Sequence, residues 1–405
     1  MKGLFTVLLA VCIIILCVAC EIKNLEQDEQ PNLPEQDMAQ DITGQDIAEQ
    51  DMPWKIAIYT TERHYGRSIL DYPNEYQEGR AYIKYPEQVV LGTIIEQFSQ
   101  KEQYEKELVE KGLALIQDEQ IKVFIASMRS EELLREIKKQ RPDILIISFG
   151  GYDNLYETEL SDIILVIDIL TMSERMVQQA FTMGANTFIY YASYKSTEIS
   201  SLMERYCIPI IEDTCDKLGM KYIMEDISLT SIPPDTIHVD LEEKVSQYGK
   251  NIFAYVESCS FSVSLFNDAM RLGLIMSQPC HPSIFCGFPG WYWGEDRKDY
   301  GIITEFDFDQ QIERAREKAA EMGMTGRSSC WRVPFNTLPL TAAIDFAIDY
   351  INNDLQADID LPTMEKYFIH ALESLGVDAN EIGLELTQHP DYPNCFMFTE
   401  DYILI

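Results

Sequence analysis

The chain has 405 residues, of which 67 are Asp or Glu and 32 are Lys or Arg, so its formal net charge is −35 at pH 7. This excess of carboxylates argues against nucleic acids and other polyanions as partners, because neutralising phosphates requires clustered lysines and arginines. The length is sufficient for two α/β lobes, each with a sizeable hydrophobic core.

The first twenty residues, MKGLFTVLLAVCIIILCVAC, contain one lysine, then an apolar run from Leu4 to Ile15, then small residues before Cys20. The run is too short and too weakly flanked for a stable transmembrane helix, so it predicts a secretory signal peptide over residues 1–19. Its ending, CVAC, resembles a bacterial lipobox, which implies a lipid on Cys20 that holds the protein on the extracytoplasmic face of the cell membrane. Plain secretion and a retained helix are the alternatives.

Residues 20–53 combine the expected lipidated cysteine with an acidic stretch. Between residues 21 and 52 the sequence has ten Asp or Glu, one Lys and no aromatic residue, with a loose repeat of the form QDMA, QDIT and QDIA. Such a segment cannot bury enough apolar surface to offset its chain entropy. We therefore predict a disordered tether between the lipid and the folded domain, with a short amphipathic helix as the alternative.

From residue 54 onward, short apolar runs alternate with segments whose apolar residues have helical spacing. The runs are continuous, which is typical of strands buried on both faces in a parallel sheet that is covered by helices. Five such strands read WKIAIYTT, IKVFIAS, DILIISF, DIILVIDIL and NTFIYYAS. One doubly wound lobe is therefore expected to be complete by about residue 193.

The same rhythm then restarts and includes the strands NIFAYVES and GLIMSQ, and after Arg327 a buried helix is expected to return to the first lobe. We therefore predict an α/β fold with two doubly wound, Rossmann-like lobes around an interlobe cleft. The N-terminal lobe would comprise residues 54–193 plus about 331–360. The C-terminal lobe would comprise residues 194–330 plus about 361–405.

Three stretches carry a resemblance to a known family. They are YGKNIFAYVESCSFSVSLFNDAMRLG, the following QPCHPSIFCGFPG, and the later GRSSCWRVPFNTLPLTAAIDFAIDY. They resemble an uncharacterised bacterial lipoprotein family of unknown function with a type 1 periplasmic-binding-protein-like fold, over residues 54 to 400. The resemblance implies capture of a small solute for an ABC importer, or sensing for a membrane receptor, and it implies neither a reaction nor a cofactor. Ser258 departs from the Asn expected there.

In open α/β sheets, ligands bind beyond the carboxyl ends of the strands, where loops and helix N-termini present unpaired N–H groups. Reading those positions along the chain yields the candidate ligand-binding residues Thr60, Thr61, Glu62, Tyr65, Ser127, Phe149, Gly150, Tyr152, Ser193, Tyr194, Ser258 and Cys259. The pair Gly150-Gly151 is either a flexible turn or a loop that lets the backbone approach a ligand. It matches neither GxGxxG nor a P-loop, so no phosphate cofactor is expected.

The stretch SQPCHPSIFCGFPGWYWGED, residues 277–296, holds the densest group of reactive side chains. A zinc site requires four ligands, whereas Cys280, His281 and Cys286 supply three, and neighbours on an extended loop point in opposite directions. A cysteine nucleophile requires a separate, oriented histidine, and nothing in the sequence identifies one. We expect no metal and no enzymatic activity, with a hydrolase that uses Cys259 or Cys280 as an alternative. A disulfide between Cys280 and Cys286, or from Cys259 to either, stays open.

Aromatic residues offer a better interpretation of this stretch. Trp291 and Trp293 lie among prolines and glycines, and aromatic faces pack against sugars and nucleobases. We expect these two rings and His281 to line the cleft, although the rings could instead plug the edge of the lobe. Arg332 is also a candidate, which either clamps a ligand carboxylate or pairs with an acid at the hinge.

Together these observations predict a lipid-anchored, extracytoplasmic solute-binding protein. Its ligand would be a small polar molecule, and the aromatic content favours a sugar or a nucleoside. The lobes would close over the ligand by hinge motion. A cysteine-dependent hydrolase and a ligand-free interaction protein on the same fold are the alternatives.

Overall fold

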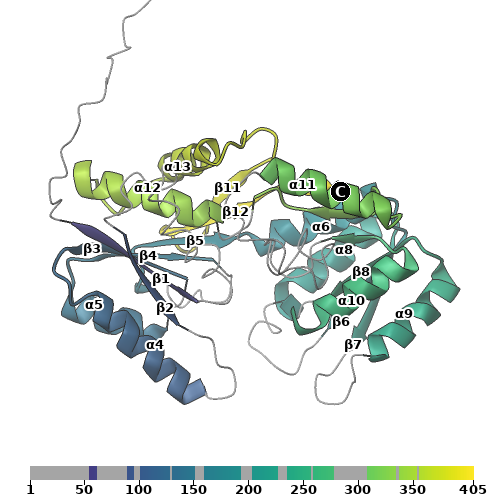
Figure 1. The fold of residues 1–405 in the computed structure, drawn as a ribbon, viewed down its shortest axis with the longest axis horizontal. Helices are drawn as coiled ribbons and strands as arrows, with labels where there is room; N and C mark the ends of the chain where they lie inside the picture. Colours follow the sequence, from purple (N-terminus) through teal and green to yellow (C-terminus); the bar gives the residue numbers. More distant parts are fainter. Residues whose placement is uncertain are drawn as a thin grey trace, which may run out of the picture. The chain divides into compact units, whose positions relative to one another are not determined.

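The computed structural model describes residues 54–61, 89–94, 101–127, 130–150, 159–192, 203–226, 235–256, 259–277, 308–333, 337–353 and 355–405. The expected signal peptide, Cys20 and the acidic tether lie outside the described residues. No helix in the described part of the chain combines the length and the apolar character needed to cross a bilayer. The described residues form two mostly parallel β-sheets with helices packed on their faces (Figure 1).

The first sheet has seven strands in the order β11-β12-β5-β4-β3-β1-β2. Every neighbouring pair is parallel except β11 with β12. The strands are β1 (Lys55–Thr61), β2 (Val89–Ile94), β3 (Ile121–Ala126), β4 (Leu145–Phe149), β5 (Ile163–Ile167), β11 (Glu385–Gln388) and β12 (Cys395–Thr399). All residues of β4 and β5 are buried, as their continuous apolar sequences predict.

Helices cover both faces of the first sheet, with α4 and α5 on one side and α12 and α13 on the other (Figure 1). These helices are α4 (Lys101–Leu115), α5 (Glu131–Gln140), α12 (Thr337–Asn353) and α13 (Leu361–Ser374). Alternate strand residues serve the two faces: Ile56 and Ile58 pack in the cluster that contains α12, whereas Ala57 and Tyr59 pack in the cluster that contains α4 and α5. This arrangement is the doubly wound lobe that the sequence predicts.

The second sheet consists of two three-stranded parts, β7-β6-β8 and β13-β10-β9. A parallel bridge between Phe253 and Ile275 joins them, because the Ile275 N–H donates to the Ile252 carbonyl at 2.9 Å. Only β13 runs antiparallel to its neighbour. The strands are β6 (Thr187–Ala192), β7 (Lys221–Asp226), β8 (Ile252–Val256), β9 (Met276–Ser277), β10 (Ser328–Cys330) and β13 (Ile403–Leu404).

Helices also pack on both faces of the second sheet. They are α6 (Ile169–Thr182), the π-helical turn η4 (Met203–Cys207) that leads into α8 (Ile208–Leu218), α9 (Asp235–Tyr248), α10 (Cys259–Leu272) and α11 (Phe308–Glu321). Phe188 and Tyr190 pack in the cluster that contains α6 and α8, whereas Ile189 and Tyr191 pack in the cluster that contains α9, α10 and α11. The predicted fold class, an α/β fold with two doubly wound lobes, is confirmed.

The described chain passes from one sheet to the other at three crossover segments. The first is Asp168, between β5 and α6; the second begins at Trp331, between β10 and α12; the third is residues 400–402, between β12 and β13. Each segment directly follows the carboxyl end of a strand. Positions beyond these ends are where ligands bind in open α/β sheets.

Two of the expected lobe boundaries differ from this topology. The strand over residues 187–192 was expected in the first lobe, but β6 pairs with β7 and β8. Residues 361–400 were expected in the C-terminal lobe, but α13 packs on α12, and β11 and β12 belong to the first sheet. The repeated strand–helix rhythm is the same on both sides of a crossover, so it does not reveal where the chain changes sheets.

Candidate ligand-binding site at the crossover segments

The carboxyl ends of β5 and β12 lie side by side, because these strands are parallel neighbours with Ile167 opposite Phe398. The Asp168 N–H donates to the Phe398 carbonyl at 2.8 Å. The second crossover segment joins them, because the Val333 N–H donates to Oε2 of Glu400 at 3.3 Å. We call Asp168, Trp331, Arg332, Thr399 and Glu400 the crossover cluster.

Asp168 has a structural role in this cluster. It is the N-cap of α6, and its Oδ1 accepts from the backbone N–H groups of Leu170 and Thr171 at 3.1 Å each. Its Oδ2 accepts from the Thr171 hydroxyl at 2.8 Å. These bonds satisfy N–H groups that the first turn of a helix leaves unpaired. Asp168 therefore fixes the start of α6 directly after the first crossover.

Glu400 is completely buried, and this burial raises the pKa of its carboxyl well above the ordinary value, to about 8. The Val333 N–H and other backbone contacts from the second crossover act in the opposite direction, but desolvation is the larger effect. At neutral pH the side chain is therefore mainly a neutral acid, which can both donate and accept a hydrogen bond. Its Oε1 has no partner among the described residues.

Three further polar atoms of the cluster are buried and receive no partner from the described residues. They are the indole N–H of Trp331, the guanidinium Nε–H of Arg332 and the hydroxyl of Thr399. Trp331 is held by Phe398 and Tyr402, with ring centroids at 6.3 and 6.2 Å. Each buried polar group left unpaired costs about 1–3 kcal/mol, so such atoms in one cluster indicate a site that is completed by another molecule.

The two outer nitrogens of Arg332 are already occupied. Nη1 donates to Glu381 and Nη2 donates to Asp309, both at 2.5 Å. Of the two roles expected for Arg332, the structure therefore shows pairing with acids near a crossover and not a free clamp for a ligand carboxylate. Asp309 lies in the first turn of α11. Its side chain forms this ion pair with Arg332.

The structure describes four of the predicted ligand-binding residues: the side chains of Ser127, Phe149 and Arg332, and the backbone conformation of Gly150. Ser127 is half-buried directly after β3, and its N–H donates to the Tyr59 carbonyl at 3.1 Å. Gly150 has φ 74°, a left-handed conformation that favours glycine, and follows β4 as predicted. Phe149 is a correction: its side chain is completely buried in the core of the first sheet, which removes it from the candidate site. Arg332 is paired as above.

The other predicted site residues are only partly described or lie outside the described residues. The backbone places Thr60 and Thr61 at the carboxyl end of β1 and Cys259 at the start of α10, with no described side chains. The residues outside the described ranges are Glu62, Tyr65, Tyr152, Ser193, Tyr194, Ser258, His281, Trp291 and Trp293. Cys280 and Cys286 also lie there, so the open disulfide alternatives among them and Cys259 fall outside the described side chains.

Of the crossover cluster, Asp168, Trp331, Thr399 and Glu400 were not predicted from the sequence as site residues. A signal was present, because Glu400 directly follows the apolar run CFMFT and is the first charged residue after a buried strand. Residues 361–405 were expected in the C-terminal lobe, where the end of this run would have no link to the crossover. The pairing of β12 with β5 is what brings Glu400 to the site.

Four cysteines have described side chains. Cys207, Cys215, Cys330 and Cys395 are buried. Burial raises the pKa of Cys215 to about 12 and raises the pKa of Cys330 even more. A nucleophilic cysteine requires a thiolate, so these two side chains are inert at neutral pH.

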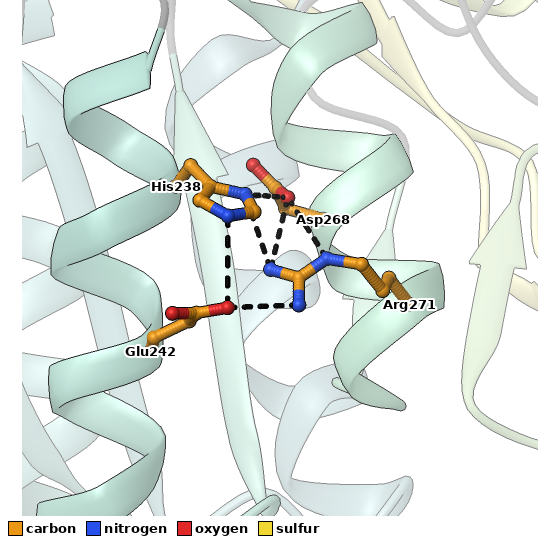
Figure 2. Close-up of polar contacts among 4 residues, drawn as sticks. All are labelled: His238, Glu242, Asp268 and Arg271. Carbon is orange, nitrogen blue, oxygen red and sulfur yellow. Dashed lines mark hydrogen bonds and ion pairs between the residues drawn. The ribbon is translucent and has the colours of Figure 1, made fainter.

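A second polar cluster links α9 to α10, away from the crossover segments (Figure 2). Nδ1 of His238 lies 2.6 Å from Asp268, and Nε2 lies 3.6 Å from Glu242. Arg271 contacts both carboxylates, at 3.2 Å from Asp268 and 2.9 Å from Glu242. Each ring nitrogen of His238 therefore faces a carboxylate, which makes this network a clip between two helices. Within the described residues, no group of three or more His, Cys, Asp or Glu side chains is arranged to hold a metal ion.

Comparison with solved structures supports the fold. A protein from Clostridium difficile 630, provisionally described as a transcriptional regulator, has a similar crystal structure with a TM-score of 0.67 and 19% sequence identity. The likeness covers 87% of this chain and 99% of that one. At this identity the likeness shows a shared fold and nothing about the ligand.

More distant likenesses include two transport proteins. A sugar ABC transport substrate-binding protein from Bordetella parapertussis 12822 has a TM-score of 0.44 and 10% identity, with 87% of this chain and 89% of that chain covered. An ABC transporter substrate-binding protein from Desulfitobacterium hafniense, in complex with Leu, has a TM-score of 0.41 and 10% identity, with 87% and 100% covered. Likenesses this weak carry no argument about function.

Comparison of the sequence itself gives one match. The family model described as "Protein of unknown function (DUF3798)" matches residues 54–329. No curated protein matches the chain.

Proposed function

Since this chain belongs to the DUF3798 family of proteins of unknown function, we propose its function from its own site: it is an extracytoplasmic solute-binding protein that captures a small polar ligand. The finer parts of this proposal are a lipid anchor at Cys20, a sugar or nucleoside as the ligand, and an ABC permease or a membrane receptor as the partner. The protein binds its ligand and does not transform it.

The observation that carries the proposal is the position of the crossover cluster. Its members lie at or directly after the carboxyl ends of β5, β10 and β12, where the chain leaves one sheet for the other. A ligand that bonds to these segments has a different affinity for each arrangement of the sheets. Such a ligand shifts the population toward the arrangement it prefers, which is how hinged binding proteins report that they are loaded.

The location rests on the sequence. The signal-like residues 1–19 and the lipobox-like CVAC before Glu21 support export and attachment at Cys20, and the acidic tether would give the folded part reach from the membrane. Labelled palmitate should be incorporated by the full chain in a bacterial host and lost in Cys20→Ser. Equal incorporation by both chains would contradict the anchor.

A thermal-shift assay tests the binding function. The purified mature protein would be heated with D-glucose, D-ribose, adenosine, myo-inositol, L-leucine and L-glutamate, each in turn. A ligand at 100 times its Kd stabilises the folded state by about 2.7 kcal/mol, which is a readily measured rise in Tm. At least one class should raise Tm in proportion to the logarithm of its concentration. If no class does so, the proposed function is wrong.

A further inference from the structure

We propose that the crossover cluster binds hydroxyl groups of an uncharged polyhydroxy ligand, through Trp331, Arg332 Nε, Thr399 and Glu400. This inference rests on the proposed function and deepens it, because it names the recognising atoms and the chemical class that they select. It favours a sugar, a polyol or the ribose of a nucleoside over an amino acid or another carboxylate.

The hydrogen-bonding character of the unpaired atoms fits hydroxyl groups. The N–H groups of Trp331 and Arg332 can only donate, whereas the Thr399 hydroxyl and the carboxyl of Glu400 can donate and accept. A hydroxyl group both donates and accepts, so neighbouring hydroxyls of one ligand can satisfy this mixed set. An ammonium group can only donate, so it would leave the N–H groups of Trp331 and Arg332 unpaired, whereas a carboxylate could accept from the set but would bring a negative charge.

The charges around the cluster point to a neutral ligand. Arg332 is already paired with Asp309 and Glu381. Arg175 in α6 is likewise paired with Glu385 at 2.5 Å and with Asp401, the residue after Glu400, at 3.1 Å. An incoming carboxylate would compete with four carboxylates for two guanidinium groups. A neutral hydroxyl avoids this repulsion.

Burial adds a second reason. Trp331 is 4% exposed, Thr399 1% and Glu400 0%. Groups this deeply buried leave little water to screen a charge, so a ligand must bring its own matching hydrogen bonds. The ring contacts of Trp331 with Phe398 and Tyr402 hold its indole in place. Internal water is the rival occupant, since it also donates and accepts.

Calorimetric titration of the mature protein provides the test. D-glucose, D-ribose, myo-inositol and adenosine represent neutral hydroxyl-bearing ligands, and L-leucine and L-glutamate represent charged ones. The variants are Trp331→Phe, which removes the indole N–H, and Glu400→Leu with its conservative partner Glu400→Gln. Trp54→Phe is the matched control, because Trp54 is also buried, at 6% exposure. It directly precedes β1 and so lies at the amino end of that strand, whereas the crossover cluster lies at carboxyl ends of strands.

A neutral compound should bind the unmodified protein and Trp54→Phe with the same Kd. Loss of one hydrogen bond in Trp331→Phe should raise Kd about tenfold. Glu400→Leu should raise Kd by about the same factor, and Glu400→Gln by less because the amide still donates and accepts. In addition, the indole ¹⁵N–H signal of Trp331 in the unmodified protein should move when the compound is added, a readout that does not depend on any variant folding.

The outcomes separate this inference from the function on which it rests. If only leucine or glutamate binds, the inference is wrong and solute binding stands. If a neutral compound binds without moving the Trp331 signal and with unchanged Kd in the variants, the ligand lies elsewhere, water occupies the cluster, and the inference is again wrong alone. If no compound binds, both the inference and the proposed function fail.

Discussion

Glu400 accepts a hydrogen bond from the backbone N–H of Val333 at 3.3 Å, and this contact ties the second crossover segment to the third. In sequence, the whole of α12, α13 and the β11–β12 hairpin lies between these two residues. The ionisable carboxyl group of Glu400 therefore lies on a segment that connects the two sheets and has no solvent exposure. The first prediction follows from that burial.

Raising the pH should destabilise the protein through Glu400. Its pKa is about 8 in the folded state and near 4.5 when exposed, so the folded state holds the proton more tightly. The stabilisation from this group is complete below about pH 4.5 and is lost as the pH rises through about 8, on the order of 5 kcal/mol in all. Urea unfolding at pH 5 and pH 8 should therefore show a greater loss for the unmodified protein than for Glu400→Gln. Equal losses of unfolding free energy in the two proteins would show that a group other than Glu400 causes the pH dependence.

Arg332→Gln should lower the free energy of unfolding by about 1–2 kcal/mol. Arg332 is 15% exposed and joins Asp309 in α11 to Glu381 before β11, but both acids are more than half exposed, which limits the value of each pair. Arg135→Gln is the control, because Arg135 is 62% exposed and pairs only within α5 with Glu131. Urea denaturation should show no measurable change for the control. A loss of the same size in both variants would refute a special role for Arg332.

Gly383→Ala should destabilise the protein more than Gly184→Ala. Both glycines have positive φ, 55° and 90°, so both alanine variants carry backbone strain of about 1 kcal/mol. A Cβ at Gly184 would meet no atom within 4 Å, whereas a Cβ at Gly383 would lie 2.1 Å from Oδ2 of Asp401. Asp401 would have to move away from Arg175, which should add about 1–2 kcal/mol. Thermal unfolding of the two variants measures the difference, and equal Tm values would contradict it.

Asp268→Asn should loosen the clip between α9 and α10. Asp268 is largely buried and contacts His238 and Arg271, so its loss should cost about 1–2 kcal/mol. Glu242 contacts the same two residues but is 49% exposed, and Glu242→Gln should cost less than about 0.5 kcal/mol. Hydrogen exchange of α9 and guanidinium unfolding report both effects. The reverse order of the two variants would show that burial does not decide the strength of the clip.

Cys215 and Cys330 should be unreactive toward a thiol reagent in the folded protein. Burial raises the pKa of both thiols and also shields them from the reagent. Titration with dithiobis-nitrobenzoate before and after denaturation, compared with Cys215→Ser and Cys330→Ser, should show that these two thiols appear only on unfolding. Rapid reaction of either one in the folded state would contradict this prediction.

The sequence by itself determined the type of element and the fold class. Continuous apolar runs such as IILVI and LIISF must be buried on both faces, and that requirement alone predicts parallel sheets covered by helices. It also predicts that ligands would bind beyond the strands' carboxyl ends, where Gly150 adopts the left-handed conformation expected of a glycine turn.

Only the tertiary structure decided which strands are neighbours. A buried apolar strand fits several partners equally well, so the sequence could not show that β6 joins β7 and β8 or that β12 joins β5. For the same reason it could not show that Glu400 meets Val333 or that Arg332 meets Asp309 and Glu381. Those contacts join chain segments that are distant in sequence. Neither the local spacing of apolar residues nor the composition shows which distant segments meet.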